Sequence, residues 1–497
     1  MSGATPNGTE GTGGIGGEAD FADRELHFIA IGGAGMSALA LACHALGARV
    51  SGSDRSESGY VERLRAAGIE PLIGHDADAV PPGADVVVST AIPDDNVELR
   101  RARERGQREI HRGRLLAELC ATKRLIAVAG AHGKTTTSGM LAHCLSRAGA
   151  EPAFLLGGEL PGAGPDGAPA NAGWGTGEWI VAEADESDGS FLELAPEVAA
   201  VTNVELDHHS HWGGERELIA AFARFTGPAA AVVRPAGPKL AALDGAGSIA
   251  TFALSEPGAP PPAAASVLAT DIQPVEGGST FTLISAEAGE QRVRLAVPGR
   301  HNVIDATCAI AALIEARRLD PGLPPTEELV AALATFPGMA RRLERKGEHR
   351  GALVYDDYAH HPTEVEASLR ALRELPRPPG GRLIAVFQPH LYSRTKALAS
   401  RFGRALALAD EVAVLDVYPA REQPVGPLEG VSGLQVAEAA ADAAPGKRVR
   451  WLGGLGVAAD ALAADEGIGP GDIVVTIGAG DVVRVAERLV GDHGRAS

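Results

Sequence analysis

The segment GAHGKTTTSGM at positions 130–140 constrains the fold of this chain more than any other stretch. The general phosphate-loop pattern G-x-x-x-x-G-K-[ST] places a glycine five residues before Gly133, where this sequence has Val128. The remaining context is intact, because an apolar run precedes the loop and Lys134 and Thr135 open a helix-like segment. Backbone N–H groups at such a turn bind phosphate, so we expect a shortened nucleotide loop. The alternatives are a glycine-rich loop with a solvated lysine and a threonine run that only caps a helix.

Short apolar runs alternate with amphipathic segments along most of the chain, which is typical of α/β units. The length of 497 residues allows about three domains of roughly 150 residues each. We therefore predict an α/β protein with a Rossmann-like domain, a central P-loop domain and a C-terminal Rossmann-like domain. The predicted spans are 22–121, 122–337 and 338–497, after a disordered tail at 1–21. The stretch PGAPPPAAA predicts a surface loop.

Composition excludes several classes of protein. The net charge of −19 argues against nucleic acid or an anionic membrane as a partner. No uninterrupted apolar run reaches ~18 residues, so we predict no membrane insertion. The first residues lack the basic and apolar regions of a signal peptide. The four cysteines form no C-x-x-C pair, which argues against a zinc site or a disulfide scaffold and favours a reducing cytoplasm.

A second glycine-rich turn, in HFIAIGGAGMS, follows the first predicted strand. The dinucleotide fingerprint G-x-G-x-x-G would need glycines at 30, 32 and 35, and the sequence has Ala30, Gly32 and Gly35. This turn could bring backbone N–H groups to a diphosphate, or it could be only a tight strand-to-helix connection. Asp54, which ends the next predicted strand, could accept a hydrogen bond from a ribose hydroxyl or could cap the following segment.

The string VAEADESD ends a strand in carboxylates from Glu183 to Asp188. Clustered carboxylates repel one another, so a bound cation is one explanation, with Glu183 or Asp185 as a hard oxygen ligand for Mg²⁺. A solvated acidic loop is the other. The next strand closes with TNVELDHHSHW, whose histidines could reach the metal or the substrate.

Two strings in the C-terminal third, YDDYAHHPTEV and FQPHLYSRT, each begin where a strand is predicted to end. Their polar residues should therefore gather at one edge of a parallel sheet. Aspartate, histidine and arginine side chains suit a polar substrate that has a carboxylate and an amine. The alternative is that these residues only form a turn and open a helix. The residues concerned are Asp356, Asp357, His360, His361, His390 and Arg394.

Taken in order, these strings resemble the Mur ligase family, and DDYAHHPTEV with FQPH resembles its alanine-adding branch. The resemblance covers the chain from about residue 25 to its end and also includes PGRHN, FPGMARRLE and DVYPAREQP. It implies an ATP-dependent amide ligase with Mg²⁺ as cofactor, acting in the synthesis of a peptidoglycan precursor. ATP would phosphorylate the lactyl carboxylate of UDP-N-acetylmuramate, and the amine of L-alanine would attack the acyl phosphate.

The resemblance also implies roles for individual residues, with the first domain binding the UDP substrate, the second ATP and the third the amino acid. The nucleotide would contact Gly130, Ala131, His132, Gly133, Lys134, Thr135, Thr136, Asn302, Arg341, Arg342, Asp356 and Asp357. Mg²⁺ would bind Thr135, Glu183 and His208. UDP-N-acetylmuramate would lie near Gly32, Gly33, Gly35, Ser37, Asp54, Ser89, Thr90 and, at its muramate carboxylate, His132. L-alanine would lie near Tyr358, His360, His390 and Arg394, and the catalytic set would be Lys134, His208, His360, His390 and Arg394.

Two positions depart from the family pattern. Ala30 replaces a glycine that is usual in the first loop, and Leu391 stands where many members have a second arginine. The amino acid is therefore less firmly predicted than the reaction, and a related ligase for another amino acid or a preformed peptide stays open. A binding protein with an NAD-type first domain and no ligase chemistry is a third possibility. We expect a monomer or homodimer that closes around a hinge near residues 337–338.

Overall fold

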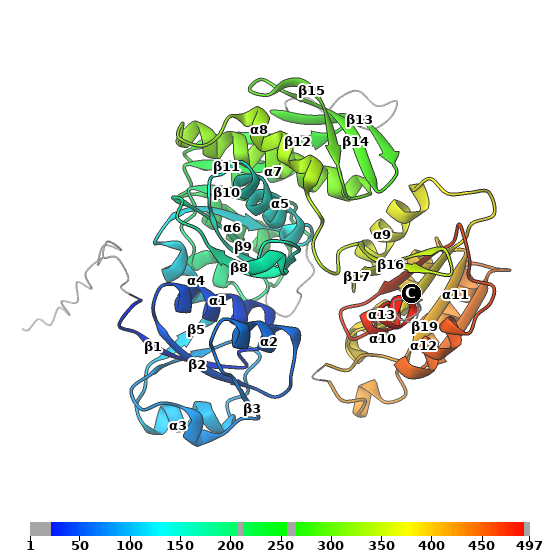
Figure 1. Ribbon diagram of the computed structural model, residues 1–497, viewed down its shortest axis with the longest axis horizontal. Coiled ribbons are helices and arrows are strands. Elements are labelled where there is room, and N and C mark those ends of the chain that lie inside the picture. The colour runs from blue at the N-terminus through cyan, green and yellow to red at the C-terminus, as the bar shows by residue number, and fades with distance from the viewer. Residues whose placement is uncertain (1–20, 206–211, 256–264, 421, 492–497) are drawn as a thin grey trace, which may run out of the picture.

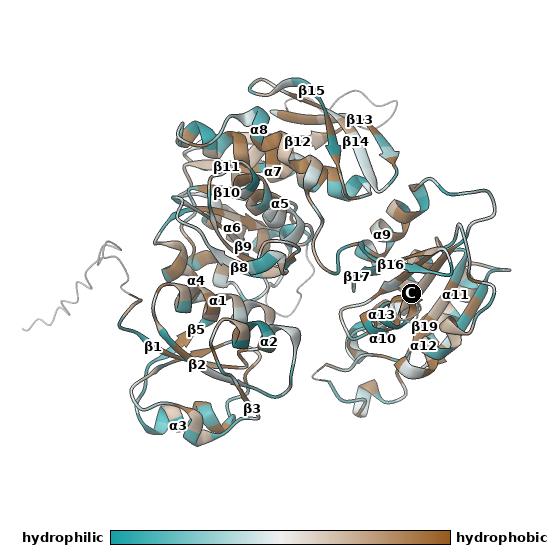
Figure 2. Cartoon of the chain, viewed as in Figure 1, coloured by the Kyte–Doolittle hydropathy of each residue, from teal (hydrophilic) through white to brown (hydrophobic). Residues whose placement is uncertain are grey.

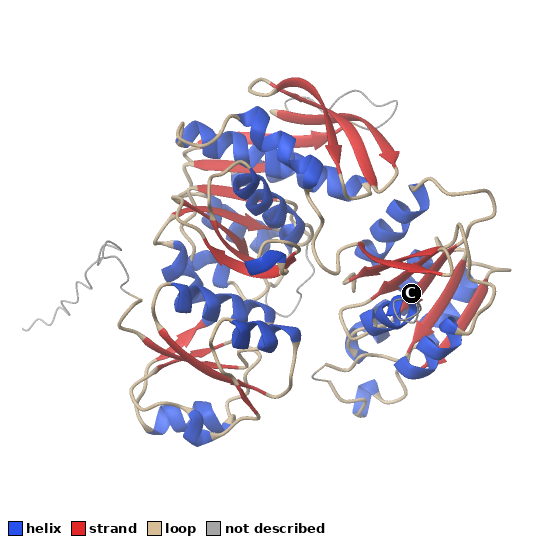
Figure 3. Cartoon of the chain, viewed as in Figure 1, coloured by secondary structure: helices blue, strands red, loops and turns tan. Residues whose placement is uncertain are grey.

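The computed structural model describes residues 21–205, 212–255, 265–420 and 422–491 (Figure 1). Their strands form three sheets of five, ten and six strands in chain order, which confirms the predicted three-part α/β architecture. Figure 3 shows helices packed beside each sheet, and Figure 2 shows apolar residues concentrated on the strands and on the helix faces toward them. None of the helices in the described residues combines the length and apolarity needed to cross a membrane. The segment PGAPPPAAA lies almost entirely outside these residues.

The first sheet is parallel and has the order β3-β2-β1-β4-β5. Because β1 lies between β2 and β4, the chain reverses its direction of winding there, and a crevice opens at the carboxyl ends of β1 and β4. Phe21, expected in the tail, is buried in this unit with 2% of its surface exposed. The strands are β1 (Glu25–Ile29), β2 (Arg49–Asp54), β3 (Leu72–Ile73), β4 (Asp85–Val88) and β5 (Glu109–His111). The helices are α1 (Ala34–Ala45), α2 (Gly59–Ala66), α3 (Val97–Glu104) and α4 (Arg112–Cys120).

The central sheet has the order β15-β14-β13-β12-β11-β10-β6-β9-β7-β8. It is parallel from β13 to β7, and the antiparallel strands β14, β15 and β8 extend its two edges. Its strands are β6 (Arg124–Ala129), β7 (Ala153–Leu160), β8 (Ala170–Trp174), β9 (Trp179–Ala184), β10 (Val198–Val201), β11 (Ala231–Pro235), β12 (Ser248–Leu254), β13 (Val267–Val275), β14 (Gly278–Ser285) and β15 (Gly289–Leu295). Its helices are α5 (Lys134–Arg147), α6 (Glu215–Thr226), α7 (Arg300–Leu319) and α8 (Thr326–Ala331).

The third sheet has the order β16-β17-β21-β18-β19-β20, and only β16 runs antiparallel. Two of its parallel strands, β17 and β18, end at the strings YDDYAHHPTEV and FQPHLYSRT, as predicted from the sequence. The strands are β16 (Glu344–His349), β17 (Ala352–Asp357), β18 (Leu383–Phe387), β19 (Glu411–Leu415), β20 (Arg448–Gly453) and β21 (Ile473–Ile477). The helices are α9 (Pro362–Glu374), α10 (Tyr392–Leu406), α11 (Leu434–Ala443), α12 (Leu455–Ala463) and α13 (Val483–Gly491).

The connection between the second and third sheets packs against the central unit. The N–H of Ala340 donates to the carbonyl of Glu159 at 2.8 Å, and the side chain of Glu159 forms an ion pair with Arg63 on α2. One strand end of the central sheet therefore contacts both the first unit and the chain that leads into the third. The domain boundaries and the hinge at residues 337–338 stay predictions.

Candidate active site

The loop between β6 and α5 has the backbone shape that its glycines require. Gly133 has a φ of 81°, in the left-handed region that favours glycine. A Cβ atom at this position would stand 2.3 Å from Oδ1 of Asp305 on α7. No other residue fits without displacing that carboxylate. The predicted strand, glycine loop and helix are thus confirmed as local structure.

Sheet topology decides what flanks this loop. Strand β6 lies between β9 and β10, with Ala129 paired to Ala184 on one side and to Val201 on the other. The acidic string after β9 and the string TNV after β10 therefore lie on opposite sides of the loop. The amide of Asn203 accepts from the backbone N–H of His132 at 3.1 Å and donates to its carbonyl at 2.7 Å. Sequence reasoning did not single out Asn203, although it stood in a string that was noted.

The ammonium of Lys134 is paired with a carboxylate inside the protein. It donates to Oε2 of Glu186 at 3.0 Å and to the carbonyl of Gly130. Burial opposes the charge of Lys134, but the nearby carboxylates, led by Glu186, outweigh burial and raise its pKa. A permanent positive charge therefore stands at the start of α5, where the amino end of the helix adds to its attraction for anions.

Each of the carboxylates from 183 to 188 has a partner within the protein, and Asp185 and Asp188 share one. Glu183 accepts from the hydroxyl of Thr135 at 2.9 Å and from the N–H of Gly157 at 3.0 Å. Asp185 and Asp188 accept from Arg112 at 3.0 and 3.1 Å, and Glu186 pairs with Lys134. Protein cations thus relieve much of the repulsion that suggested a bound metal.

The predicted Mg²⁺ ligands can be compared only in part. Thr135 and Glu183 are in contact and supply the hard oxygen donors that Mg²⁺ prefers, so these two residues fit the ion. His208 lies outside the described residues. Within the part of the chain that the structure describes, no three histidine, cysteine or acidic residues come together as a metal cluster. Two ligands and open space are consistent with Mg²⁺, which usually keeps several waters.

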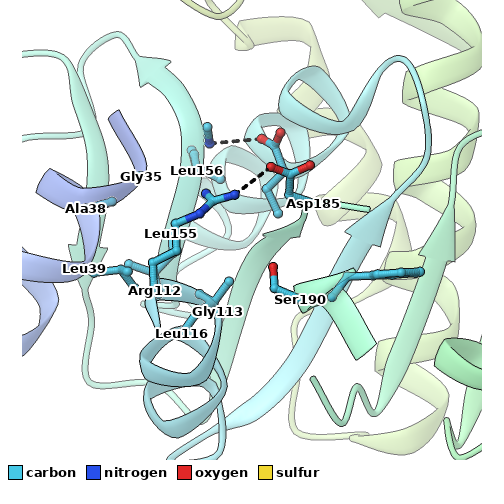
Figure 4. A pocket seen from close by; sticks show the side chains of 13 residues that line it. Gly35, Ala38, Leu39, Arg112, Gly113, Leu116, Leu155, Leu156, Asp185 and Ser190 are labelled. Atoms are coloured by element: carbon cyan, nitrogen blue, oxygen red, sulfur yellow. Dashed lines mark hydrogen bonds and ion pairs between the residues drawn. The ribbon is translucent and has the colours of Figure 1, made fainter. Parts of the chain in front are cut away.

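Arg112, at the start of α4, is a site residue that sequence reasoning missed. Arg112 and Asp185 both line a cavity of about 270 Å³ between the first two units. Figure 4 shows the guanidinium of Arg112 pointing to Asp185. Burial opposes ionisation of Asp185, but Lys134 and Arg112 lower its pKa to about 2. The sequence signal that could have identified Arg112 is its position directly after the end of strand β5. The cavity is lined by Gly35, Ala38 and Leu39 of α1, Arg112, Gly113 and Leu116 of α4, and residues of β7, β9 and the segment after it.

The glycine-rich turn after β1 is fixed by residues of its own domain. The carboxylate of Asp54 accepts from the N–H of Gly32 at 2.9 Å, and a Cβ atom on Gly32 would stand 2.8 Å from Val61. Ala30 adopts a φ of 60°, so the residue that replaces the usual glycine still takes the left-handed turn. Asp54 thus shapes the preceding loop, a role beyond the ribose contact and the cap that were considered from the sequence. Ser89 and Thr90 follow β4, which pairs in parallel with β1, so they lie at the same edge of the sheet as this turn.

Ser37 is placed differently from the expectation that it faces a diphosphate. It is buried, its hydroxyl donates to the carbonyl of Ala34 at 3.0 Å, and Asn171 of β8 donates to it at 3.2 Å. Ser37 therefore joins the first unit to the central one. Gly33 and Gly35 stay at the exposed side of the turn, with Gly35 in the 270 Å³ cavity.

The two aspartates at the end of β17 shape the loop that follows them. Asp356 is fully buried and accepts from Arg341 at 3.0 Å and from Thr476, so it lies inside the sheet and not at the crevice. Asp357 accepts from the N–H groups of Leu343 and Ala359 at 2.8 and 2.7 Å. Burial raises the pKa of Asp357 to about 6. Unlike Asp356, Asp357 also lines a cavity.

The remaining third-domain residues do come together. The His360 ring lies 5.6 Å from the Tyr358 ring and 6.1 Å from the His390 ring, and His390 stacks on Tyr418. Burial lowers the pKa of His360, which favours the neutral imidazole. Arg394 lies in the first turn of α10, and among the described residues its buried Nη1 has no hydrogen-bond partner. An arginine donor of this kind is ready for an anion.

Two cavities meet at His132 and Glu364. One of about 210 Å³ lies between α7 and α9, and one of about 290 Å³ surrounds the loop at 131–136. Burial raises the pKa of Asp305, a residue that sequence reasoning missed, to about 8. The smaller cavity brings together His132, Gly133, Thr136, Asn203, Asn302, Asp305, Arg342, Asp357 and Glu364. The larger brings together Ala131, His132, Gly133, Lys134, Thr135, Thr136, Glu183, Asp185, Arg342, Tyr358, His360 and Glu364.

Three family models match most of the chain in succession. Residues 25–124 match the model described as Mur ligase family, catalytic domain. Residues 128–313 match the Mur ligase middle domain, and residues 341–480 match the Mur ligase, glutamate ligase domain.

Individual relatives agree with these matches. The chain is 45% identical to a UDP-N-acetylmuramate–L-alanine ligase from Kineococcus radiotolerans, over 94% of this chain and 95% of the relative. It is 43% identical to the enzyme of the same name from Mycobacterium marinum, over 94% of both chains. Among solved structures, a UDP-N-acetylmuramate-alanine ligase from Thermotoga maritima superposes with a TM-score of 0.79 at 27% identity, covering 95% of this chain and 100% of that one.

Proposed function

The chain belongs to the Mur ligase family, and from this premise we propose that it joins L-alanine to the lactyl carboxylate of UDP-N-acetylmuramate at the expense of ATP. The relatives that match nearly its whole length carry the name of this activity. The reaction supplies a precursor of peptidoglycan. Its family membership leaves no support for the NAD-type binding protein considered from the sequence.

One observation carries the proposal. Glu183 and Asp185 line both the 270 Å³ cavity beside the first-domain turn and the 290 Å³ cavity around the phosphate loop. A carboxylate bound in the first cavity can therefore approach a phosphate bound in the second. His360 and Tyr358 of the third domain form another wall of the second cavity. The three parts of an ATP-dependent ligation meet at this point.

The chemistry explains why these groups are needed. A carboxylate is a poor electrophile, so its oxygen first attacks the γ-phosphorus of ATP, and ADP leaves. The amine of L-alanine then attacks the carbonyl carbon of the acyl phosphate, the C–O bond to phosphate breaks, and the amine loses a proton. Lys134 and the N–H groups of the loop stabilise the transferred phosphoryl group. When bound at Thr135 and Glu183, Mg²⁺ would supply further charge neutralisation there.

The third-domain residues suit the amino acid. The lowered pKa of His360 supports a role as acceptor of the amine proton, since only a neutral imidazole can take it. The buried donor of Arg394 supports binding of the amino-acid carboxylate. Leu391 has a φ of 69° and is the N-cap residue of α10. Its apolar side chain does not bind this carboxylate as the second arginine of many family members would. We further propose a cytoplasmic setting and leave monomer and homodimer as predicted alternatives.

The experiment is phosphate release with UDP-N-acetylmuramate, ATP and Mg²⁺ against L-alanine, L-serine, glycine and short peptides. We expect the highest kcat/KM with L-alanine. Preference for a peptide or another amino acid would redirect the proposal to a different Mur-type ligase, and no release with any acceptor would reject it.

A further inference from the structure

The contact between His132 and Glu364 links two domains at the centre of the site. Nδ1 of His132, in the phosphate loop, lies 3.3 Å from Oε1 of Glu364, near the start of α9. A ring contact between the same two segments supports this link, because His132 stacks on His361, just before α9, with ring centroids 5.9 Å apart. Both His132 and Glu364 line both cavities described above, so the pair forms the wall between them.

The second oxygen of Glu364 is used within the third domain. Oε2 accepts from the backbone N–H groups of His360 and His361 at 3.0 and 3.2 Å. This is a capping box, in which a glutamate at the third helical position holds the chain just before the helix. Glu364 thereby fixes the backbone of His360, the residue assigned to the amine proton.

The partner of Glu364 is equally fixed. The backbone of His132 is held on both sides by the amide of Asn203, and its carbonyl also accepts from Thr202 at 2.6 Å. Although burial opposes the charge of Glu364, the hydrogen bond from His132 and the charge of Arg342 hold its pKa well below the ordinary value. A charged carboxylate thus stands between two rigid backbones from different domains.

We infer that Glu364 is a positioning residue that sets His360 in register with the phosphate loop through its simultaneous contacts with His132 and the α9 capping box. The inference rests on the proposed ligase function. It assigns to one carboxylate two tasks that are usually separate, the end of a helix and the docking of a domain. Glu364 itself needs no contact with the reacting atoms.

The first test is steady-state kinetics of Glu364→Ala and Glu364→Gln beside the matched control Glu366→Ala. Glu366 lies on the same helix, and within the described part of the chain it pairs only with Arg370, on the surface. We expect Glu364→Ala to lower kcat about 100-fold, since misplacement of a reacting group by an ångström costs that much. The KM for UDP-N-acetylmuramate should change less than about threefold, because all of its proposed contacts except His132 are in the first domain. Glutamine still caps the helix and should recover roughly a tenth of the lost activity.

A second test separates positioning from simple loss of a helix cap. In a His132→Ala background, Glu364→Gln should cost less than about twofold, because residues that act as a unit are not additive. Amide hydrogen exchange at residues 130–136 should be faster in Glu364→Ala and unchanged in Glu366→Ala, since only Glu364 reaches that loop. This measurement needs no turnover.

The outcomes are distinct. Unchanged kcat in Glu364→Ala, or an equal cost of Glu364→Gln with and without His132, or unchanged exchange in the loop would overturn the inference. A wild-type enzyme that ligates no amino acid in the same assay would instead reject the proposed function.

Discussion

The protein contains two glycine-rich turns of similar appearance, one after β1 and one after β6, and they are built for different tasks. In the first, a carboxylate of the same domain, Asp54, takes the N–H of Gly32. In the second, Lys134 adds a positive charge, and the flanking groups come from other strands and from α7. The first turn is therefore shaped before any ligand arrives, whereas the second adds a protonated ammonium, paired with Glu186, to its backbone N–H groups. A glycine-rich turn alone indicates only that the backbone passes close to another group, which can be a ligand or a neighbouring side chain.

The largest difference between the turns should follow from removing that charge. Lys134→Ala is expected to lower kcat by about 100- to 1000-fold, the usual cost of losing one preorganised donor to a transition state. Binding of UDP-N-acetylmuramate, measured by calorimetry without ATP, should stay within about threefold of wild type because the first turn is untouched. Normal turnover in this variant would contradict the assignment of the loop.

A matched pair of glycine substitutions should divide the two substrates. Gly133→Ala puts a methyl group 2.3 Å from Asp305, so we expect the KM for ATP to rise at least about tenfold. Gly32→Ala puts one 2.8 Å from Val61 and should instead raise the KM for UDP-N-acetylmuramate. Initial rates against each substrate test this directly. The same KM affected by both changes would show that the turns do not serve separate ligands.

Glu183 is the carboxylate of the second turn that should report on metal. Glu183→Ala removes the acceptor of Thr135, and we expect the Mg²⁺ concentration for half-maximal rate to rise about tenfold or more. Asp188→Ala is the control, since Asp188 contacts Arg112 at the edge of the same string. Identical Mg²⁺ titrations for wild type and Glu183→Ala would remove Glu183 from the metal site.

The smallest effect concerns the stability of the second turn. Burial raises the pKa of Asp305 to about 8, whereas an unfolded chain titrates aspartate near about 3.9. Between these values the folded state binds the extra proton, so stability is present at low pH and is lost as pH rises toward 8. Asp305→Asn should raise the melting temperature of the nucleotide-free protein by several degrees at pH 8. The gain should vanish near pH 4, and a gain that is constant with pH would contradict this account.

The elements could be predicted wherever the signal is local. The loop at 130–136 and the strand ends before Asp357 and His390 were found because apolar runs stop at recognisable strings. Several strands were not identified from the sequence; among them, β7, β8 and β16 are rich in glycine or charge and gain their stability from neighbours in the sheet.

The site was predictable only in part, and a place inside one of those strings did not by itself reveal a residue's role. Arg112, Asn203, Asp305 and Glu364 acquire their roles from elements that meet only in the folded chain. Ser37 and Asp356 show the reverse: the family resemblance placed Ser37 at a ligand and a strand-end pattern placed Asp356 there, but both side chains are buried in packing contacts. The local sequence therefore does not reveal which side chains contact a neighbouring domain.

The buried cysteines have a practical consequence. Cys43 and Cys120 lie on helices of the first unit and Cys144 and Cys308 on helices of the central one; all four are buried free thiols, and burial raises their pKa, that of Cys43 to about 12. Folded protein should therefore react slowly with alkylating reagents. Among the described residues, the third unit carries no cysteine. The rate of thiol labelling thus reports the opening of the first two units, independently of motions in the third unit.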